Sequence, residues 1–185
     1  MKRAGFVFPA EAQRCGKKYK RGIIMKLYLK QEVFTFLDSY NIYDANQMPV
    51  YKVKTRIYKF PPGFDIVSCM GDIIFTVSRH FQFFGRKYDI LHNEMTVATI
   101  ERRFALFERA LDITTVTGDV FSVDGDYFAW NFTITKNGMP YATVNKAFLS
   151  WGDSYEIEVY DDRECAFATA LVVAIDDTFH DGKRR

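Results

Sequence analysis

The stretch CAFATALVVAI, residues 165–175, decides the fold of this 185-residue chain. It contains no charged residue, and Thr169 is its only polar member. A segment that is apolar on every side must be surrounded by other parts of the protein. As a helix it would be about 16 Å long, too short for a hydrocarbon core of about 30 Å, so we expect a buried core helix rather than a membrane span. A buried strand is the alternative: the pair Val172 and Val173 favours it, whereas four alanines favour the helix.

Acidic residues mark the start of this helix. Asp161 or Asp162 can cap the first turn, and Asp161 with Glu164 has the spacing of a capping box. We therefore expect the central helix near residues 162–179.

A short pattern recurs along the preceding part of the chain: an aromatic residue or leucine, any residue, then isoleucine. The isoleucines follow one another at intervals of about 21 to 24 residues, and they are Ile42, Ile66, Ile90, Ile113, Ile134 and Ile157. Each unit contains an alternating run, then turn residues, then a longer β-rich run. Asn137–Gly138 is the strongest of these turn signals. The pattern therefore predicts a series of hairpins.

Counting the arms of these hairpins predicts about twelve strands. They lie near residues 27–36, 40–44, 50–59, 64–69, 73–83, 87–92, 96–107, 110–116, 119–124, 130–136, 140–149 and 154–160. Short strands joined by tight turns favour an antiparallel meander, and closure into a barrel removes exposed edges. A barrel this wide is not filled by its own side chains. We therefore predict a mostly β fold: a twelve-stranded antiparallel closed β-barrel that encloses a hydrophobic C-terminal α-helix.

Charge divides the chain into three parts. Residues 1–24 contain seven basic residues and one acidic residue, whereas the whole chain has a net charge of +2. Residues 25–185 therefore have a negative net charge. We expect residues 1–24 to be a basic, disordered arm, residues 25–181 the barrel domain, and residues 182–185 a basic tail. Two interpretations of the arm stay open: a leader that precedes a true start at Met25, or a working basic tail.

No catalytic or cofactor motif is present. The chain has no HExxH, P-loop, GxGxxG or GxSxG sequence, and none of His80, His92 and His180 has a metal-ligand partner at useful spacing. We therefore expect no enzyme activity, no cofactor and no metal. The three cysteines are Cys15, Cys69 and Cys165; because they are odd in number and form no CxxC pair, we expect them to be reduced and the protein to be cytoplasmic.

The candidate binding residues are Lys52, Lys54 and Arg56. They alternate along one predicted strand with Val53, Thr55 and Ile57. Alternation places the three bases on one face and the intervening side chains toward the core. Such a stripe is either a solvated face or a site for an anionic headgroup or phosphate. Residues 79–88 form an aromatic and basic run. Packing inside the barrel explains this run better than stacking of its aromatic rings on nucleobases, so we do not expect a nucleic-acid partner.

Two segments carry a resemblance to a known family: KAFLSWGDSYEIEV, residues 146–159, and ALVVAID, residues 170–176. With the hairpin pattern, they resemble the LURP-one-related family over residues 25–181. This family is a branch of the tubby C-terminal-like superfamily, which includes the phospholipid scramblases. The resemblance implies a twelve-stranded barrel threaded by a hydrophobic C-terminal helix.

The resemblance also bears on function. Tubby relatives bind phosphoinositides and scramblases act at membranes, but this sequence has no recognisable tubby lipid-binding motif and lacks the proline-rich region and cysteine cluster of scramblases. We expect a non-enzymatic binding or scaffold module that contacts anionic phospholipid headgroups, peripherally, at the cytosolic membrane surface. The alternatives are an enzyme or small-ligand binder with a pocket at one barrel end, and a protein-partner scaffold that binds no lipid. The sequence does not define the oligomeric state.

Overall fold

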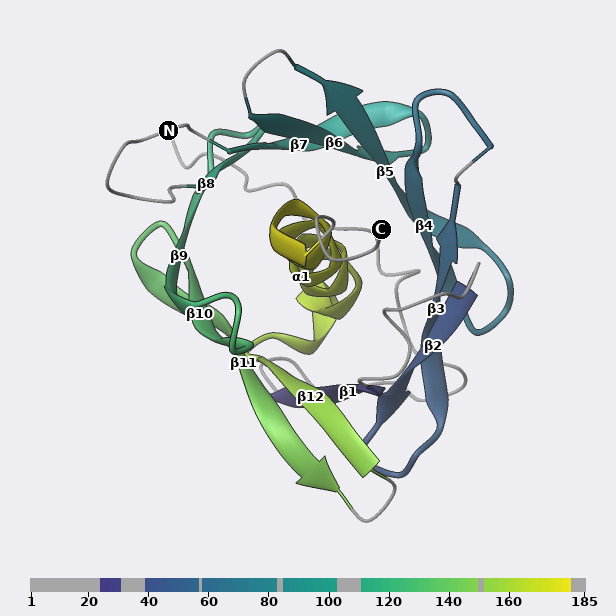
Figure 1. Ribbon diagram of the computed structural model, residues 1–185, viewed down its shortest axis with the longest axis vertical. Helices are drawn as coiled ribbons and strands as arrows, with labels where there is room; N and C mark the ends of the chain where they lie inside the picture. Colours follow the sequence, from purple (N-terminus) through teal and green to yellow (C-terminus); the bar gives the residue numbers. More distant parts are fainter. Residues whose placement is uncertain are drawn as a thin grey trace.

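The computed structural model describes residues 24–30, 39–56, 58–82, 85–102, 111–149 and 152–180. Within these ranges, twelve strands form one closed barrel around a single α-helix, as the sequence predicts (Figure 1). The elements are β1 (Met25–Lys30), β2 (Ser39–Asp44), β3 (Pro49–Thr55), β4 (Gly63–Ser68), β5 (Ile73–Phe81), β6 (Arg86–His92), β7 (Met95–Arg102), β8 (Leu111–Thr115), β9 (Val120–Asp126), β10 (Asn131–Lys136), β11 (Met139–Leu149), β12 (Gly152–Val159) and α1 (Cys165–His180). The predicted arm and the tail of residues 182–185 lie outside the described residues, Ile24 excepted.

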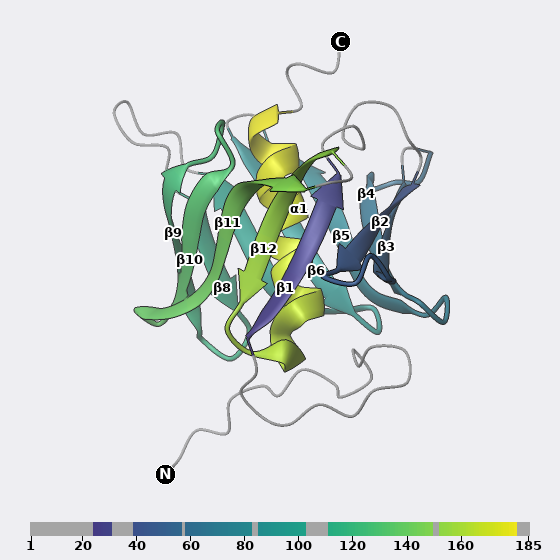
Figure 2. The same cartoon turned by 90° about the horizontal axis from the view of Figure 1, so that it is seen from below.

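The barrel is a simple meander. Each strand pairs antiparallel with its neighbours in sequence, and β1 pairs with β12 to close the ring, with Met25 opposite Val159. Because β12 ends just before α1 begins, every turn that follows an even-numbered strand lies at the end of the barrel where α1 starts. We call this the entry end. The opposite end, where α1 finishes, is the exit end (Figure 2).

The six isoleucines singled out in the sequence are all fully buried. In four hairpins the pairing register shifts directly after such an isoleucine, at Ile42, Ile66, Ile90 and Ile134. A bulge bends a strand and increases its twist. In each case the extra residue belongs to the following strand, so these four isoleucines lie beside the positions at which that strand bends around the helix.

The start of α1 differs in detail from the prediction. A short 3-10 turn, Asp162–Glu164, precedes the helix, and the Asp161 side chain accepts a bond from the backbone N–H of Arg163 at 3.1 Å. The capping box is not formed. Instead, the Glu164 carboxylate accepts bonds from the Tyr141 hydroxyl at 3.1 Å and Lys136 at 3.4 Å, because it points into the barrel wall.

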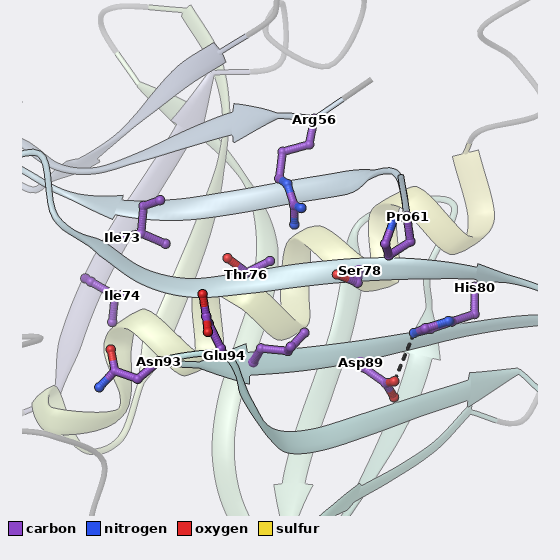
Figure 3. A pocket seen from close by; sticks show the side chains of 11 residues that line it. Arg56, Pro61, Ile73, Ile74, Thr76, Ser78, His80, Asp89, Asn93 and Glu94 are labelled. Atoms are coloured by element: carbon purple, nitrogen blue, oxygen red, sulfur yellow. Dashed lines mark ion pairs between the residues drawn. The ribbon is translucent and has the colours of Figure 1, made fainter. Parts of the chain in front are cut away.

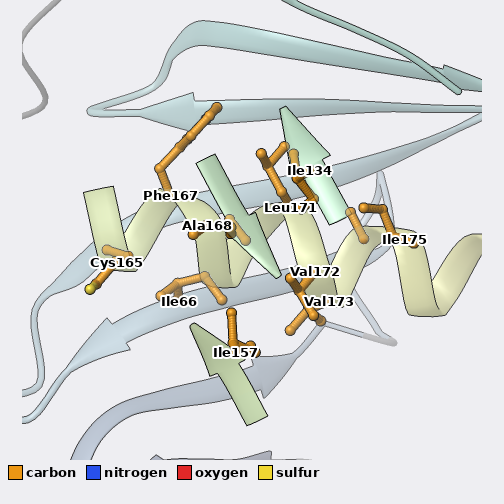
Figure 4. Packing of buried hydrophobic residues seen from close by; sticks show 14 of the residues in the cluster. Ile66, Ile134, Ile157, Cys165, Phe167, Ala168, Leu171, Val172, Val173 and Ile175 are labelled. Atoms are coloured by element: carbon orange, nitrogen blue, oxygen red, sulfur yellow. The ribbon is translucent and has the colours of Figure 1, made fainter. Parts of the chain in front are cut away.

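The helix fills the interior of the barrel (Figure 4). Leu171 and Val172 are completely buried, and Phe167 packs its ring 5.7 Å from that of Phe75 and 5.8 Å from that of Phe121. Four helix alanines, at 166, 168, 170 and 174, are buried as well and let the surrounding strands approach closely. Burial of each large apolar side chain contributes about 1.5 to 3 kcal/mol, so this packing is the main stabilisation of the fold.

Arginines from three strands hold the exit end of α1. The Nη2 atom of Arg79 lies 2.6 and 2.5 Å from the two carboxylate oxygens of Asp177. Arg86 donates to the Asp177 backbone carbonyl at 2.8 Å, and Arg102 to that of Thr178 at 3.4 Å. The last carbonyls of a helix lack intrahelical partners and carry a partial negative charge. The arginines therefore satisfy these carbonyls and attach the helix to β5, β6 and β7.

The cysteines differ from the expectation. Cys165 is free and buried, but Cys69 is disulfide-bonded, and its partner is not among the described residues. Separation along the sequence does not determine whether two cysteines meet in space. The argument from cysteine usage to a reducing compartment therefore no longer holds.

Candidate functional site: a groove on the outer barrel wall

The predicted basic stripe is only partly an open surface. Val53 is in the core as expected, Lys54 is exposed and Lys52 is half-buried. Thr55, expected to point to the core, is exposed because β3 ends there, and residue 57 lies outside the described residues. Arg56 differs from the two lysines: its side chain is only 16% exposed and turns toward β4.

Arg56 borders a groove on the outside of the barrel, with a volume of about 520 Å³. The groove follows the outer face of β5, from Pro61 of the β3–β4 connection at the exit end to Asn93 and Glu94 of the β6–β7 turn at the entry end, and β6 borders it on one side (Figure 3). One alternative function considered from the sequence is an enzyme or small-ligand binder with its pocket at one barrel end. This groove lies elsewhere, on the side of the barrel. The barrel interior is filled by α1, so this space belongs to the wall.

Small side chains create the hollow. The outward positions of β5 are Thr76 and Ser78, whereas Phe75 and Val77 point to the core. The adjacent residue of β4 is Gly63, where an added Cβ would lie 1.9 Å from the Val77 carbonyl oxygen. Glycine is therefore required for the close approach of β4 to β5.

The guanidinium of Arg56 has unused hydrogen-bonding capacity. Its Nε and Nη1 atoms are buried, and neither has a hydrogen-bond partner among the described residues. Asp65, opposite Lys54 in the register, has its Oδ1 atom 3.8 Å from Nη1. That separation is too long for a hydrogen bond, so Asp65 balances charge without satisfying the donors. Thr76 donates to the same Asp65 oxygen at 2.8 Å.

A histidine and an aspartate occupy the opposite wall. The Nε2 atom of His80 lies 2.9 Å from Asp89 Oδ2, an ion-pair distance drawn in Figure 3. The contact lacks the angle of a hydrogen bond, so Nε2 has no hydrogen-bond partner. Thr99 donates to the other Asp89 oxygen at 3.0 Å and fixes that carboxylate. Buried nitrogen atoms without hydrogen-bond partners are uncommon in folded proteins, and this groove contains them on both walls.

Ser78, His80 and Asp89 are residue types that also form catalytic triads. A triad needs a hydrogen bond between the nucleophile and its base. Within the described part of the chain, Ser78 makes no hydrogen bond with His80. The arrangement is therefore a histidine–aspartate pair beside a serine, without the activating contact.

Exposed aromatic side chains adjoin the groove at the exit end. Tyr58 is 98% exposed and Phe60 is 91% exposed, both in the β3–β4 connection next to Arg56 and to Pro61 of the groove. Phe81, at the end of β5, is exposed as well. Aromatic residues normally bury most of their surface, so such exposure makes this end a candidate contact surface.

Two classes of site find no support in the described segments. They contain no cluster of three or more side chains able to hold a metal ion. No helix among them has the length and apolar character needed to cross a bilayer.

Comparison with known proteins places the chain in a family. A family model described as LURP-one-related matches residues 25–176. The uncharacterized protein YxjI of Bacillus subtilis is 23% identical over 153 residues, which cover 83% of this chain and 93% of that protein. An X-ray structure of a protein from Arabidopsis thaliana shares the fold with a TM-score of 0.67 at 16% identity, over 94% of this chain and 98% of that one. The fold, the order of its elements and the family match agree, and the chain belongs to the LURP-one-related family.

Proposed function

We propose that this protein is a non-enzymatic binding module that attaches peripherally to anionic phospholipid. The headgroup phosphate would occupy the part of the groove beside Arg56, and Tyr58 and Phe60 would enter the interfacial layer of the bilayer. The observation that carries this proposal is the pair of buried, unpartnered donors of Arg56.

The chemistry of Arg56 suits a phosphate. A guanidinium presents its N–H groups in a planar fork that matches two phosphate oxygens, and charge-assisted bonds of this kind are about twice as strong as neutral ones. The Nε and Nη1 atoms both lack a partner, and each forms one edge of the guanidinium together with Nη2. An anion that bridges Nη2 and one of these atoms would satisfy that donor, whereas Asp65 at 3.8 Å satisfies neither.

The surroundings favour a membrane surface over free phosphate. Tyrosine at a bilayer interface keeps its ring in the apolar layer and its hydroxyl in water. Lys59 lies between the two exposed aromatics, and Lys52 and Lys54 continue along β3. Each base near an anionic bilayer contributes about 1 kcal/mol of attraction. The aromatics supply apolar contact that a soluble phosphate cannot use.

Flotation with liposomes tests the proposal. Full-length protein should float with phosphatidylcholine vesicles that contain about 20 mol% phosphatidylserine, and raised salt should reduce this binding because exposed charges are screened over about 8 to 10 Å. The variant Lys52→Ser/Lys54→Ser/Arg56→Ser should no longer float. A second variant, Tyr58→Ser/Phe60→Ser, should float weakly at unchanged net charge.

A matched control separates a site from general attraction. The variant Lys26→Ser/Lys146→Ser/Arg163→Ser removes the same charge from β1, β11 and the turn before α1, away from the groove. It should keep most of the binding. Equal flotation of the groove variant and the wild type would contradict the proposal. So would failure of the wild type to float, which would favour a protein-partner scaffold.

One observation keeps an enzymatic alternative in view: Ser78, His80 and Asp89 line the same groove. An activated serine would react with a fluorophosphonate probe. We expect no labelling that depends on Ser78, because the hydrogen bond from Ser78 to His80 is missing. Labelling of the wild type that Ser78→Ala abolishes would replace the binding module by a hydrolase.

A further inference from the structure

The entry end of the barrel carries exposed apolar side chains on five hairpin turns. They are 63–74% exposed, and they are Met48, Met70, Met95, Val116 and Met139. We call these five residues the methionine rim. Four of the six methionines of the chain belong to it, one each at the β2–β3, β4–β5, β6–β7 and β10–β11 turns.

Turn geometry does not explain these methionines. Asn137 and Gly138 have φ of 52° and 78°, the positive values that a type I′ turn requires. The β2–β3 turn is held by the Asp44 carboxylate, which accepts from two backbone N–H groups at 2.9 Å. In the β4–β5 turn, the Ser68 hydroxyl oxygen accepts from the backbone N–H groups of Met70 at 3.2 Å and Asp72 at 3.1 Å. Other residues thus shape the turns, and an exposed methionine adds nothing to folding stability.

Acidic residues surround the rim. In the described segments 24–26, 44–48, 68–72, 92–95, 115–120, 136–139 and 158–164, eight acids accompany three bases, Lys26, Lys136 and Arg163. The acids are Asp44, Asp72, Glu94, Asp119, Glu158, Asp161, Asp162 and Glu164. The three bases are paired with members of this acidic set. Among the described residues, the apolar rim therefore lies in a negative field.

We propose that the methionine rim docks a basic amphipathic helix of a partner protein. Methionine is unbranched and flexible, so it adapts to different apolar faces and is common at surfaces that bind helices. Lysine and arginine residues beside the apolar face of such a helix would meet the acids of the rim. An anionic bilayer is disfavoured here, and so is the same rim of a second copy, because either would bring like charges together.

The spacing of the turns fits one helix. Successive turns at this end are separated by two strands, or about 10 Å, so Met48, Met70 and Met95 follow about 20 Å of the curved barrel rim. A helix rises about 1.5 Å per residue, and about 13 residues cover that length. Glu94 belongs to the acidic set and also lines the entry end of the groove. The Arg56 part of the groove and the exposed aromatics lie toward the exit end, so this proposal does not rest on lipid binding.

Fluorescence anisotropy with a defined probe tests docking on full-length protein. The probe is a labelled peptide of about 18 residues in which leucine and lysine are arranged as an amphipathic helix. We expect saturable binding that weakens with salt. A peptide of the same length with glutamate in place of lysine should not bind, because it would meet the acidic residues with like charge.

Variants place the site. Met48→Gln/Met70→Gln/Met95→Gln should weaken peptide binding at least about tenfold, since apolar anchors dominate such interfaces. The matched control Tyr58→Gln/Phe60→Gln removes exposed apolar surface from the exit end and should change binding less than about twofold. Thermal unfolding should be the same for all three proteins, because every altered side chain is exposed.

Three results would overturn the proposal: no binding of the lysine peptide to the wild type, equal binding by the methionine variant, or equal binding of the glutamate peptide. The liposome assay serves as a cross-check. The methionine variant should float like the wild type, and a loss of flotation would show that the two ends do not act separately.

Discussion

Replacing Asp177 with asparagine tests how the helix is held inside the barrel. The Asp177 carboxylate accepts bonds from Arg79 at 2.5 and 2.6 Å and from the Tyr88 hydroxyl at 2.9 Å. Its side chain is only 7% exposed. Asp177→Asn keeps the shape of the side chain but removes the Asp177 charge from beside the Arg79 guanidinium, while Arg86 keeps its bond to the backbone carbonyl.

The expected cost follows from burial. Removal of one partner from a fully buried ion pair costs about 3 to 5 kcal/mol. Because the Arg79 side chain is 25% exposed and can gain some hydration, we expect about 2 to 4 kcal/mol. Total stability of a domain is typically about 5 to 15 kcal/mol, so the variant should fold and remain measurable.

Urea denaturation of four proteins measures this effect: the wild type, Asp177→Asn, Arg79→Met and the double variant. The double variant should be less destabilised than the sum of the single variants by more than about 1 kcal/mol, because it removes the Arg79 charge together with its Asp177 partner. Arg163→Met is the control, since it breaks only the exposed pair with Asp161 and should cost less than about 1 kcal/mol. Additive effects, or a loss below about 0.5 kcal/mol for Asp177→Asn, would refute the reasoning.

Three further predictions concern the plug and its ends. Leu171→Ala should lower the free energy of unfolding by about 2 to 5 kcal/mol in urea, because Leu171 is fully buried, and a loss below about 1 kcal/mol would mean that the helix is not tightly packed. Burial raises the pKa of Tyr88 from 10.0 to about 12, and the charge of Asp177 contributes to the same shift. The protonated phenol therefore stabilises the fold below pH 10, and this stabilisation is lost as the pH rises toward 12. Denaturation between about pH 8 and 11 should show a smaller decline for Tyr88→Phe than for the wild type. Burial also raises the pKa of Glu164 above its ordinary 4.5, so its stabilising contribution is present below that pH and lost above it. Glu164→Gln should therefore melt no lower than the wild type at pH 7, and a clearly lower melting temperature would contradict this sign.

The architecture could be predicted because it depends on local composition and regular spacing. Residues 165–175 are apolar on every side, which leaves few places for them except a core. The six isoleucines recur at nearly constant intervals, and each is fully buried. Turn residues such as Asn137–Gly138 then fixed where the hairpins end.

The groove was harder to predict because it depends on pairing between strands. His80 and Asp89 are on different strands, and their contact follows from the register that places Ser78 opposite Asp89. Alternation identified the outward direction of Lys52 and Lys54, but not the turn of Arg56 toward Asp65 after the strand ends. Register within a sheet requires the full set of neighbouring strands.

The exposed aromatics and methionines were missed for another reason. Residue type alone predicts that Tyr58 and Phe60 are in the core, since most aromatic residues are buried. A usable signal was present: both lie in the YKFPPG connection, whose two prolines do not suit a central strand. Likewise, Met70 and Met139 directly adjoin a turn glycine, where an apolar side chain has no core to enter.

The filled interior determines where this protein can act. Because α1 occupies the barrel, ligands must use the outer wall or the two ends. The 16 residues of α1 separate these ends by about 24 Å, which exceeds the screening length of about 8 to 10 Å at physiological salt. Charge at one end therefore has little effect on binding at the other. A basic, aromatic exit end and an acidic, methionine-bearing entry end could thus hold an anionic membrane and a basic protein helix at the same time, without competition between them.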